Sequence, residues 1–93
     1  MTRRFLNSLT EDLYLGYIRK GMPADIARVA RRKLQQVVRA ALLQDLAVPP
    51  NNRLEALKGS RKGMYSIRVN ERWRICFIWK ETGAENIEFI DYH

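Results

Sequence analysis

The chain has 93 residues, a mass of 11.0 kDa and a net charge of +7 from 17 Lys and Arg against 10 Asp and Glu. This length predicts one domain, residues 1–93, that buries roughly 60–65% of its unfolded surface and keeps any functional site on the surface or in a shallow groove. The hydrophobic fraction of 46% excludes a disordered chain. The 12 Arg outnumber the 5 Lys, and the planar guanidinium grips phosphate bidentately, so nucleic acid is the favoured partner.

The composition also excludes several kinds of site. Cys76 is the single cysteine and His93 the single histidine, so no intramolecular disulfide and no thiolate–imidazole zinc site can form. We expect no metal and no cofactor, and a reduced, cytoplasmic compartment. No apolar run approaches the ~20 residues of a membrane span. The pair Arg3-Arg4 is followed by no apolar signal segment, so we interpret the start as mature protein.

The first half of the chain predicts two helices. Residues 2–6 fit a short strand, and Ser8-x-x-Glu11 fits a capping box that opens a helix over residues 8–19, ended by Gly21. A second helix is predicted over residues 23–43, with Pro23 in its first turn. Its apolar residues recur with a period of 3.6 and predict the buried face: Ile26, Ala30, Leu34, Val37 and Ala41. The arginines Arg28, Arg31, Arg32 and Arg39 fall on the other side.

The second half of the chain predicts strands. Apolar and polar residues alternate over residues 64–69, 73–79 and 86–92, and residues 54–58 fit a shorter strand. The short connections between the last three strands require an antiparallel meander. We therefore predict an α+β fold in which two N-terminal helices pack on one face of a twisted antiparallel sheet. In strand 73–79, Ile75 and Phe77 should face the core, and Arg74 the opposite face.

The positive charge is concentrated in two segments. Residues 19–39 carry a net +6 and residues 53–74 a net +5, whereas residues 81–93 hold four acids and no Lys or Arg. A solvated basic surface would explain these charges, and so would contact with nucleic acid or the ribosome. For the second interpretation we expect seven contact residues: Arg28, Arg32, Arg53, Arg61, Lys62, Arg68 and Arg72.

Five residues are candidates for catalysis: Glu55, Lys58, Arg74, Tyr92 and His93. Each also has a structural explanation. Glu55 fits a surface ion pair, Lys58 a solvated loop, and the terminal Tyr92-His93 a frayed end. Arg74 lies inside an apolar strand and needs an anionic partner, either Glu88, the C-terminal carboxylate or a ligand phosphate.

Together these five residues supply what RNA cleavage by its own 2′-hydroxyl requires. A carboxylate such as Glu55 removes the 2′-OH proton, and cations such as Lys58 and Arg74 stabilise the charge on the pentacoordinate phosphorus. His93, whose ordinary pKa is near neutrality, can protonate the departing 5′-oxygen. No step in this scheme needs a metal ion.

Four segments of the sequence resemble HigB-type toxins, the plasmid maintenance killer branch of the RelE/ParE superfamily. They read RLEALKG at residues 53–59, GMYSIRVN at 63–70, WRICF at 73–77 and DYH at 91–93. The resemblance implies a RelE-like microbial RNase fold and a ribosome-dependent endoribonuclease that cuts mRNA in the A site and inhibits translation. It also implies a cognate helix-turn-helix, HigA-like antitoxin, and contact with operator DNA only through the complex of the two.

Carried over by position, the resemblance assigns phosphate contacts to Lys58 and Arg74 and active-site positions to Tyr92 and His93. One position departs from part of the family. Some HigB proteins have His where this chain has Glu55, whereas nucleases similar to YoeB have Glu there and use it as the base. We therefore prefer Glu55 as base and His93 as acid.

Two other functions share this fold or this charge. A toxin similar to ParE poisons DNA gyrase without cutting RNA and needs no convergent acid–base set. A non-catalytic nucleic-acid- or antitoxin-binding module would bind through the same basic residues. The combination of Lys58, Arg74, Tyr92 and His93 favours the nuclease over both.

Overall fold

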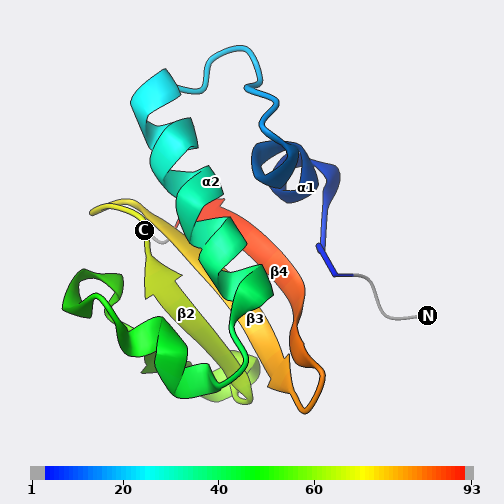
Figure 1. Ribbon diagram of the computed structural model, residues 1–93, viewed down its shortest axis with the longest axis vertical. Coiled ribbons are helices and arrows are strands. Elements are labelled where there is room, and N and C mark those ends of the chain that lie inside the picture. The colour runs from blue at the N-terminus through cyan, green and yellow to red at the C-terminus, as the bar shows by residue number, and fades with distance from the viewer. Residues whose placement is uncertain (1–3, 92–93) are drawn as a thin grey trace.

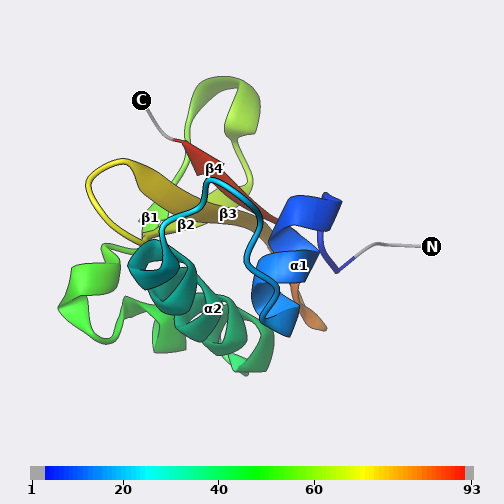
Figure 2. The same ribbon diagram turned by 90° about the horizontal axis from the view of Figure 1, so that it is seen from above.

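The computed structural model describes residues 4–91. Two helices pack on one face of a four-stranded antiparallel sheet whose strands follow chain order, β1-β2-β3-β4 (Figure 1). Seen from above, both helices lie on one side of the sheet, and the loop between β1 and β2 rises on the other side (Figure 2). The predicted α+β arrangement is therefore confirmed, and the sheet has one covered face and one open face.

Helix α1 (Ser8–Leu15) is shorter than predicted. Its N-cap is Asn7, whose Oδ1 accepts a hydrogen bond from the Thr10 backbone N–H at 3.0 Å, so the predicted capping box of Ser8 and Glu11 is wrong. The helix ends because Gly16 adopts φ +98° and donates its N–H to the carbonyls of Asp12 and Leu13. The predicted end at Gly21 is also wrong.

Helix α2 (Ala24–Arg39) follows Pro23 as its N-cap and stops four residues before its predicted end. Ala40 is extended, and a 3-10 turn, η1 (Leu43–Ala47), replaces the last helical turn. Asp45 fixes this turn by accepting the Leu42 N–H at 3.0 Å. Ala41 is consequently exposed, against its predicted place in the core. A second 3-10 turn, η2 (Pro50–Asn52), leads into the sheet.

The strands run β1 (Glu55–Ala56), β2 (Met64–Arg68), β3 (Trp73–Lys80) and β4 (Gly83–Asp91). The predicted strand at 54–58 is thus only two residues long, because the chain turns into a third 3-10 turn, η3 (Gly59–Arg61). β4 begins earlier than predicted and carries an irregularity opposite Cys76–Ile78, where Asn86 has φ +51°. Within residues 4–91, Phe5 makes only an isolated bridge to Ile87 instead of the predicted strand at 2–6.

The core lies between the helices and the covered face of the sheet. Ala30, Leu34 and Val37 of α2 are fully buried, as the helical period predicted, while Ile26 is partly buried at the edge. They pack with the inward side chains of the strands, namely Ile67, Ile75, Phe77, Ile87 and Phe89. No helix among residues 4–91 is long and apolar enough to cross a bilayer.

Candidate functional site

The open face of the sheet carries a polar row across all four strands. Because Ile67, Ile75 and Ile87 point into the core, their neighbours point outward. Glu55 of β1 pairs with Ser66 of β2, Ser66 with Cys76 of β3, and Cys76 with Glu88 of β4. One step along, Arg68 lies opposite Arg74. Two carboxylates and two guanidinium groups therefore share this face.

Arg74 is held by contacts from three parts of the chain. Its Nε donates to the Ser66 hydroxyl at 2.9 Å, and its Nη2 donates to the backbone carbonyl of Arg53 at 2.8 Å. The same Nη2 lies 3.3 Å from Oε1 of Glu55. The Arg74 side chain is only 11% exposed, whereas that of Glu55 is 53% exposed. The guanidinium is therefore fixed in place, and the carboxylate beside it is open to a ligand.

The loop from β1 to β2 positions further cations near this face. Lys58 stands at the start of η3, and Arg61 at its end. Gly59 and Gly63 flank the turn with φ +67° and +94°, conformations that only glycine adopts easily. Lys58, Arg61 and Lys62 are all exposed. This short loop, with a glycine at each end, therefore places three cations beside Glu55 and Ser66.

Cys76 shows how close the loop comes to the sheet. The thiol is fully buried although it points to the open face. Burial raises the pKa of the Cys76 thiol and Glu88 adds to this, while the positive charges of Arg61 and Arg74 oppose it. Arg61 of the loop, Arg74 of β3 and Glu88 of β4 therefore all lie close enough to the buried Cys76 thiol to shift its pKa.

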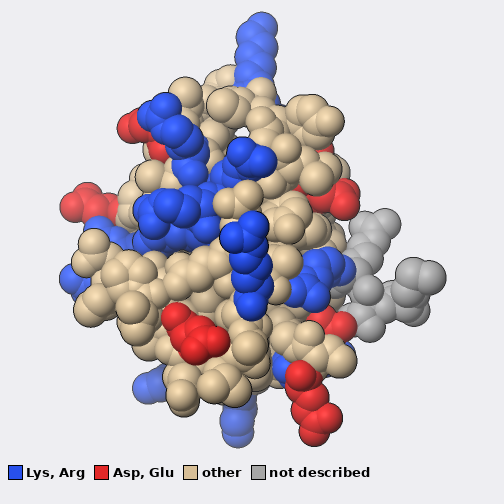
Figure 3. Space-filling view, viewed as in Figure 1, with Lys and Arg blue, Asp and Glu red and all other residues tan. Residues whose placement is uncertain are grey.

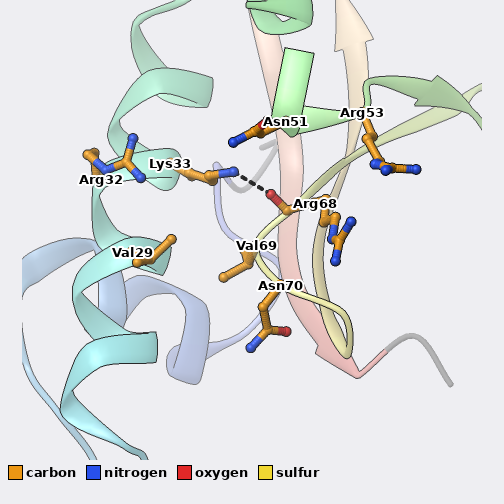
Figure 4. Close-up of a pocket in the computed structure, with 8 residues that line it drawn as sticks. All are labelled: Val29, Arg32, Lys33, Asn51, Arg53, Arg68, Val69 and Asn70. Carbon is orange, nitrogen blue, oxygen red and sulfur yellow. Dashed lines mark hydrogen bonds between the residues drawn. The ribbon is translucent and has the colours of Figure 1, made fainter. Parts of the chain in front are cut away.

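A second group of cations gathers beside α2, where Figure 3 shows Lys and Arg side chains clustered on one face of the molecule. A pocket of about 410 Å³ lies between α2 and the edge of β2, and Arg32, Lys33, Arg53 and Arg68 contribute to its wall (Figure 4). Lys33 is 5% exposed and donates from Nζ to the Arg68 carbonyl at 2.7 Å. Burial lowers the pKa of the Lys33 ammonium, and the charges of Arg32, Arg68 and Arg74 lower it further.

The predicted site residues fall into separate places. Glu55 and Arg74 are in contact, and Lys58, Arg61 and Lys62 stand on the neighbouring loop. Tyr92 and His93 lie outside the described residues. Of the predicted nucleic-acid contacts, Arg32, Arg53 and Arg68 converge on the pocket beside α2.

The other two predicted contacts lie apart. Arg72 forms an ion pair with Asp91 at 2.7 Å and stacks over Trp73. Arg28 borders a different hollow, next to Tyr17 and Ile18 of the α1–α2 connection. Arg28 and Arg72 therefore lie apart from the pocket and from the Glu55–Arg74 pair.

Ser66 and Lys33 are among the residues of these sites that were not predicted. Ser66 binds the Arg74 guanidinium from the neighbouring strand, and its outward position follows from the alternation in residues 64–69. Lys33 follows Ala30 by three residues and precedes Val37 by four, so helical spacing alone places it on the buried face. Within residues 4–91, no three His, Cys, Asp or Glu side chains come together as metal ligands would.

Comparison with known proteins identifies relatives over the whole described fold. Residues 4–93 match the HigB-like toxin family, described as the RelE-like toxin of the type II toxin–antitoxin system HigB. The chain is 40% identical to Toxin HigB-1 of Vibrio cholerae over 72 residues, which cover 77% of this chain and 75% of that protein. An uncharacterised protein of Haemophilus influenzae is 32% identical over 72 residues, 77% of this chain and 70% of that protein. Endoribonuclease HigB of Proteus vulgaris is 33% identical over 100% of both chains.

Proposed function

Because the chain belongs to the HigB-like family of RelE-like toxins from type II toxin–antitoxin systems, we propose that it acts as a ribosome-dependent endoribonuclease that cuts mRNA in the A site. Endoribonuclease activity is supported by the family and by the relative named Endoribonuclease HigB. The net charge of +7 and the open sheet face suit a polyanion that approaches from outside. Cutting translated messages would arrest translation.

The observation that carries this proposal is the contact between Glu55 and Arg74. A half-exposed carboxylate lies 3.3 Å from a guanidinium that is itself almost buried and fixed by two further hydrogen bonds. A base must reach the substrate, and an electrostatic stabiliser must be preorganised where charge develops. The pair meets both conditions on the same face of the sheet.

In the proposed reaction, the Glu55 carboxylate takes the proton of the 2′-hydroxyl. The 2′-oxygen attacks the adjacent phosphorus and the bond from phosphorus to the 5′-oxygen breaks, leaving a 2′,3′-cyclic phosphate and a 5′-hydroxyl. Arg74 and Lys58 stabilise the negative charge on the non-bridging oxygens. His93 donates the proton that the departing 5′-oxygen receives, and Tyr92 is a further proposed catalytic residue. Every proton in this scheme moves between protein and RNA.

The family implies an antitoxin partner for this toxin. We further propose that the antitoxin is a HigA-like helix-turn-helix protein, that the toxin meets operator DNA only through it, and that the toxin works in the cytoplasm, where ribosomes are. Arg61 and Lys62 on the η3 loop, Arg28 and Arg32 on α2, and Arg53, Arg68 and Arg72 near the sheet are the proposed contacts with RNA or ribosome.

The proposal is tested with purified toxin in a reconstituted translation system, with mRNA ends mapped by primer extension. The wild type should give discrete cuts in translated messages that disappear when ribosomes are omitted. Glu55→Gln keeps the hydrogen-bonding shape and removes the base, so cleavage should fall by about 100-fold or more. Glu88→Gln is the matched control, because it makes the same change on the same face at the other end of the polar row, and it should keep cleavage within about threefold, as for a surface substitution.

Three results would contradict parts of the proposal. If Glu55→Gln cleaves as fast as Glu88→Gln, Glu55 is not the base. If the wild type arrests growth while mRNA stays intact and gyrase-dependent DNA breaks appear, the toxin acts like ParE instead. Cleavage of naked RNA at the wild-type rate would retain the nuclease and remove ribosome dependence.

A further inference from the structure

The pocket between α2 and the β2 edge presents hydrogen-bond donors and no acid. It has a volume of about 410 Å³ and lies beside the Glu55–Arg74 pair, not within it. The polar side chains of its wall are Arg32, Lys33, Asn51, Arg53, Arg68 and Asn70. Asp and Glu are missing from the residues that form the wall. Figure 4 shows Lys33 reaching from α2 to the Arg68 carbonyl, with Arg32 on the same helix and Arg53 and Arg68 on the far side of the pocket.

The four cations of this pocket have no acidic partner among the residues that the structure describes. Along residues 4–91, Arg32, Lys33, Arg53 and Arg68 form no ion pair with an acidic side chain, although four other Lys and Arg residues do. Arg68 also lies directly opposite Arg74, and like charges facing each other across two strands destabilise a sheet. The pKa of Lys33 is lowered first by burial of its ammonium, and the positive charges of Arg32, Arg68 and Arg74 lower it further. A bound anion would relieve this repulsion.

The Asn70 amide in the wall can donate to the same ligand. Oδ1 of Asn70 accepts the backbone N–H groups of Arg72 and Trp73 at 2.9 and 2.8 Å. Because this fixes which end of the amide is the oxygen, the nitrogen is the atom that Asn70 can offer to a ligand. Arginine side chains add planar donor pairs that match phosphate oxygens.

We propose that this pocket binds a backbone phosphate of the RNA strand, flanking the phosphate at the bond that is cut. The inference rests on the proposed function. The pocket would hold the RNA strand at a second phosphate, in addition to the one at the cleavage site. Two residues connect the pocket with the cleavage site: Arg53 accepts a hydrogen bond from Arg74 through its carbonyl, and Arg68 is the cross-strand neighbour of Arg74. Apart from Val29 and Val69 the wall is polar, which suits a phosphodiester better than the apolar side chains of a peptide.

The experiment measures binding without cleavage. The probe is a short 2′-O-methyl oligoribonucleotide, which has no 2′-hydroxyl to attack, titrated against the toxin by fluorescence anisotropy at several salt concentrations. Arg68→Gln should weaken binding and lower the slope of log K against log salt by about 0.7, the value for one lost contact to a single strand. Lys33→Met should have the same effect, and Arg68→Gln carries the test if Lys33→Met does not fold. Arg39→Gln is the control, because it removes one charge from α2 outside this pocket and should keep the wild-type slope.

Three outcomes would overturn this inference. They are equal slopes for Arg68→Gln and Arg39→Gln, absence of oligonucleotide binding by the wild type, and loss of antitoxin binding in pocket variants that still bind the oligonucleotide. Cleavage by the wild type is measured separately in the translation system. A toxin that binds RNA through the pocket but never cuts it would remove the proposed function and keep this site.

Discussion

Replacing Arg74 with alanine removes its contacts with Ser66, Arg53 and Glu55 among the described residues, and the energies of these three can be separated. The Nε and Nη2 hydrogen bonds, at 2.9 and 2.8 Å, come from a charged donor, and each such bond contributes about 1.5–3 kcal/mol. The contact with half-exposed Glu55 adds about 1 kcal/mol or less. Removing the nearly buried guanidinium also removes its desolvation penalty. We therefore expect Arg74→Ala to lower the free energy of unfolding by about 2–3 kcal/mol, or the melting temperature by roughly 10–20 °C.

In the proposed reaction, the same substitution removes the preorganised charge at the cleaved phosphate. Loss of one such donor typically reduces the catalytic rate by about 10²–10³. Ser66→Ala separates the two effects, because it deletes the acceptor of the Nε bond and leaves the guanidinium charge in place. We expect Ser66→Ala to lower the free energy of unfolding by about 1.5–3 kcal/mol, the contribution of one hydrogen bond from a charged donor. It should keep cleavage within about tenfold of the wild type, less than the loss of a charged stabiliser.

The assay compares cleavage rates at a temperature where calorimetry shows every variant to be folded. Each rate is divided by the folded fraction, so that unfolding cannot imitate a catalytic defect. The reasoning is refuted if Arg74→Ala, after this correction, cleaves as fast as Ser66→Ala. Arg74 would then have only a structural role, holding Arg53 and Glu55 against β3.

Three further predictions concern residues around these sites. Burial lowers the pKa of Lys33 in the folded protein, so between that pKa and 10.5 the unfolded chain binds more protons than the folded one. The free energy of unfolding should therefore rise with pH over this range. Urea unfolding from about pH 7 to 10 should show this rise in the wild type and a smaller rise in Lys33→Met. Cys76 should alkylate at pH 8 at least about tenfold more slowly in the folded protein than in urea, because burial and a raised pKa keep the thiol protonated and covered. Gly63→Ala should cost about 1–2 kcal/mol because Gly63 has φ +94°; equal melting temperatures for the two proteins would contradict this.

The sequence predicted the fold well where the pattern depends on local geometry. Alternation in residues 64–69 and 73–79 identified the inward side chains correctly, since strand parity is independent of distant contacts. The ends of the helices were harder to predict. α2 ends at Arg39, and the Leu42 N–H donates to the Asp45 carboxylate at the start of the next turn. The residue types at 40–43 contain no helix-ending signal such as Gly or Pro, so this end could not be predicted. The end of α1 depended on choosing between Gly16 and Gly21, which have the same local preference.

For the site, the sequence identified residue types but not their contacts. Glu55 and Arg74 were predicted separately, and their contact depends on the register between β1 and β2. A strand of two residues carries too little alternation to fix that register. Lys33 was missed for a different reason, because a charged side chain at a core position of a helix is read as part of the exposed face unless its phase is counted.

The two basic sites differ in how the fold treats their charge, and this difference bears on their roles. Arg74 has an acidic partner and two hydrogen bonds, so the folded protein is stabilised by it before any RNA arrives. The Lys33 pocket has four cations that no described acid neutralises, so it costs stability until an anion enters. A group that must hold one geometry through a reaction benefits from the first arrangement, and a group that must attract and release a strand benefits from the second. Arg68→Gln should therefore stabilise the free toxin and weaken RNA binding, whereas Arg74→Ala should weaken both stability and cleavage.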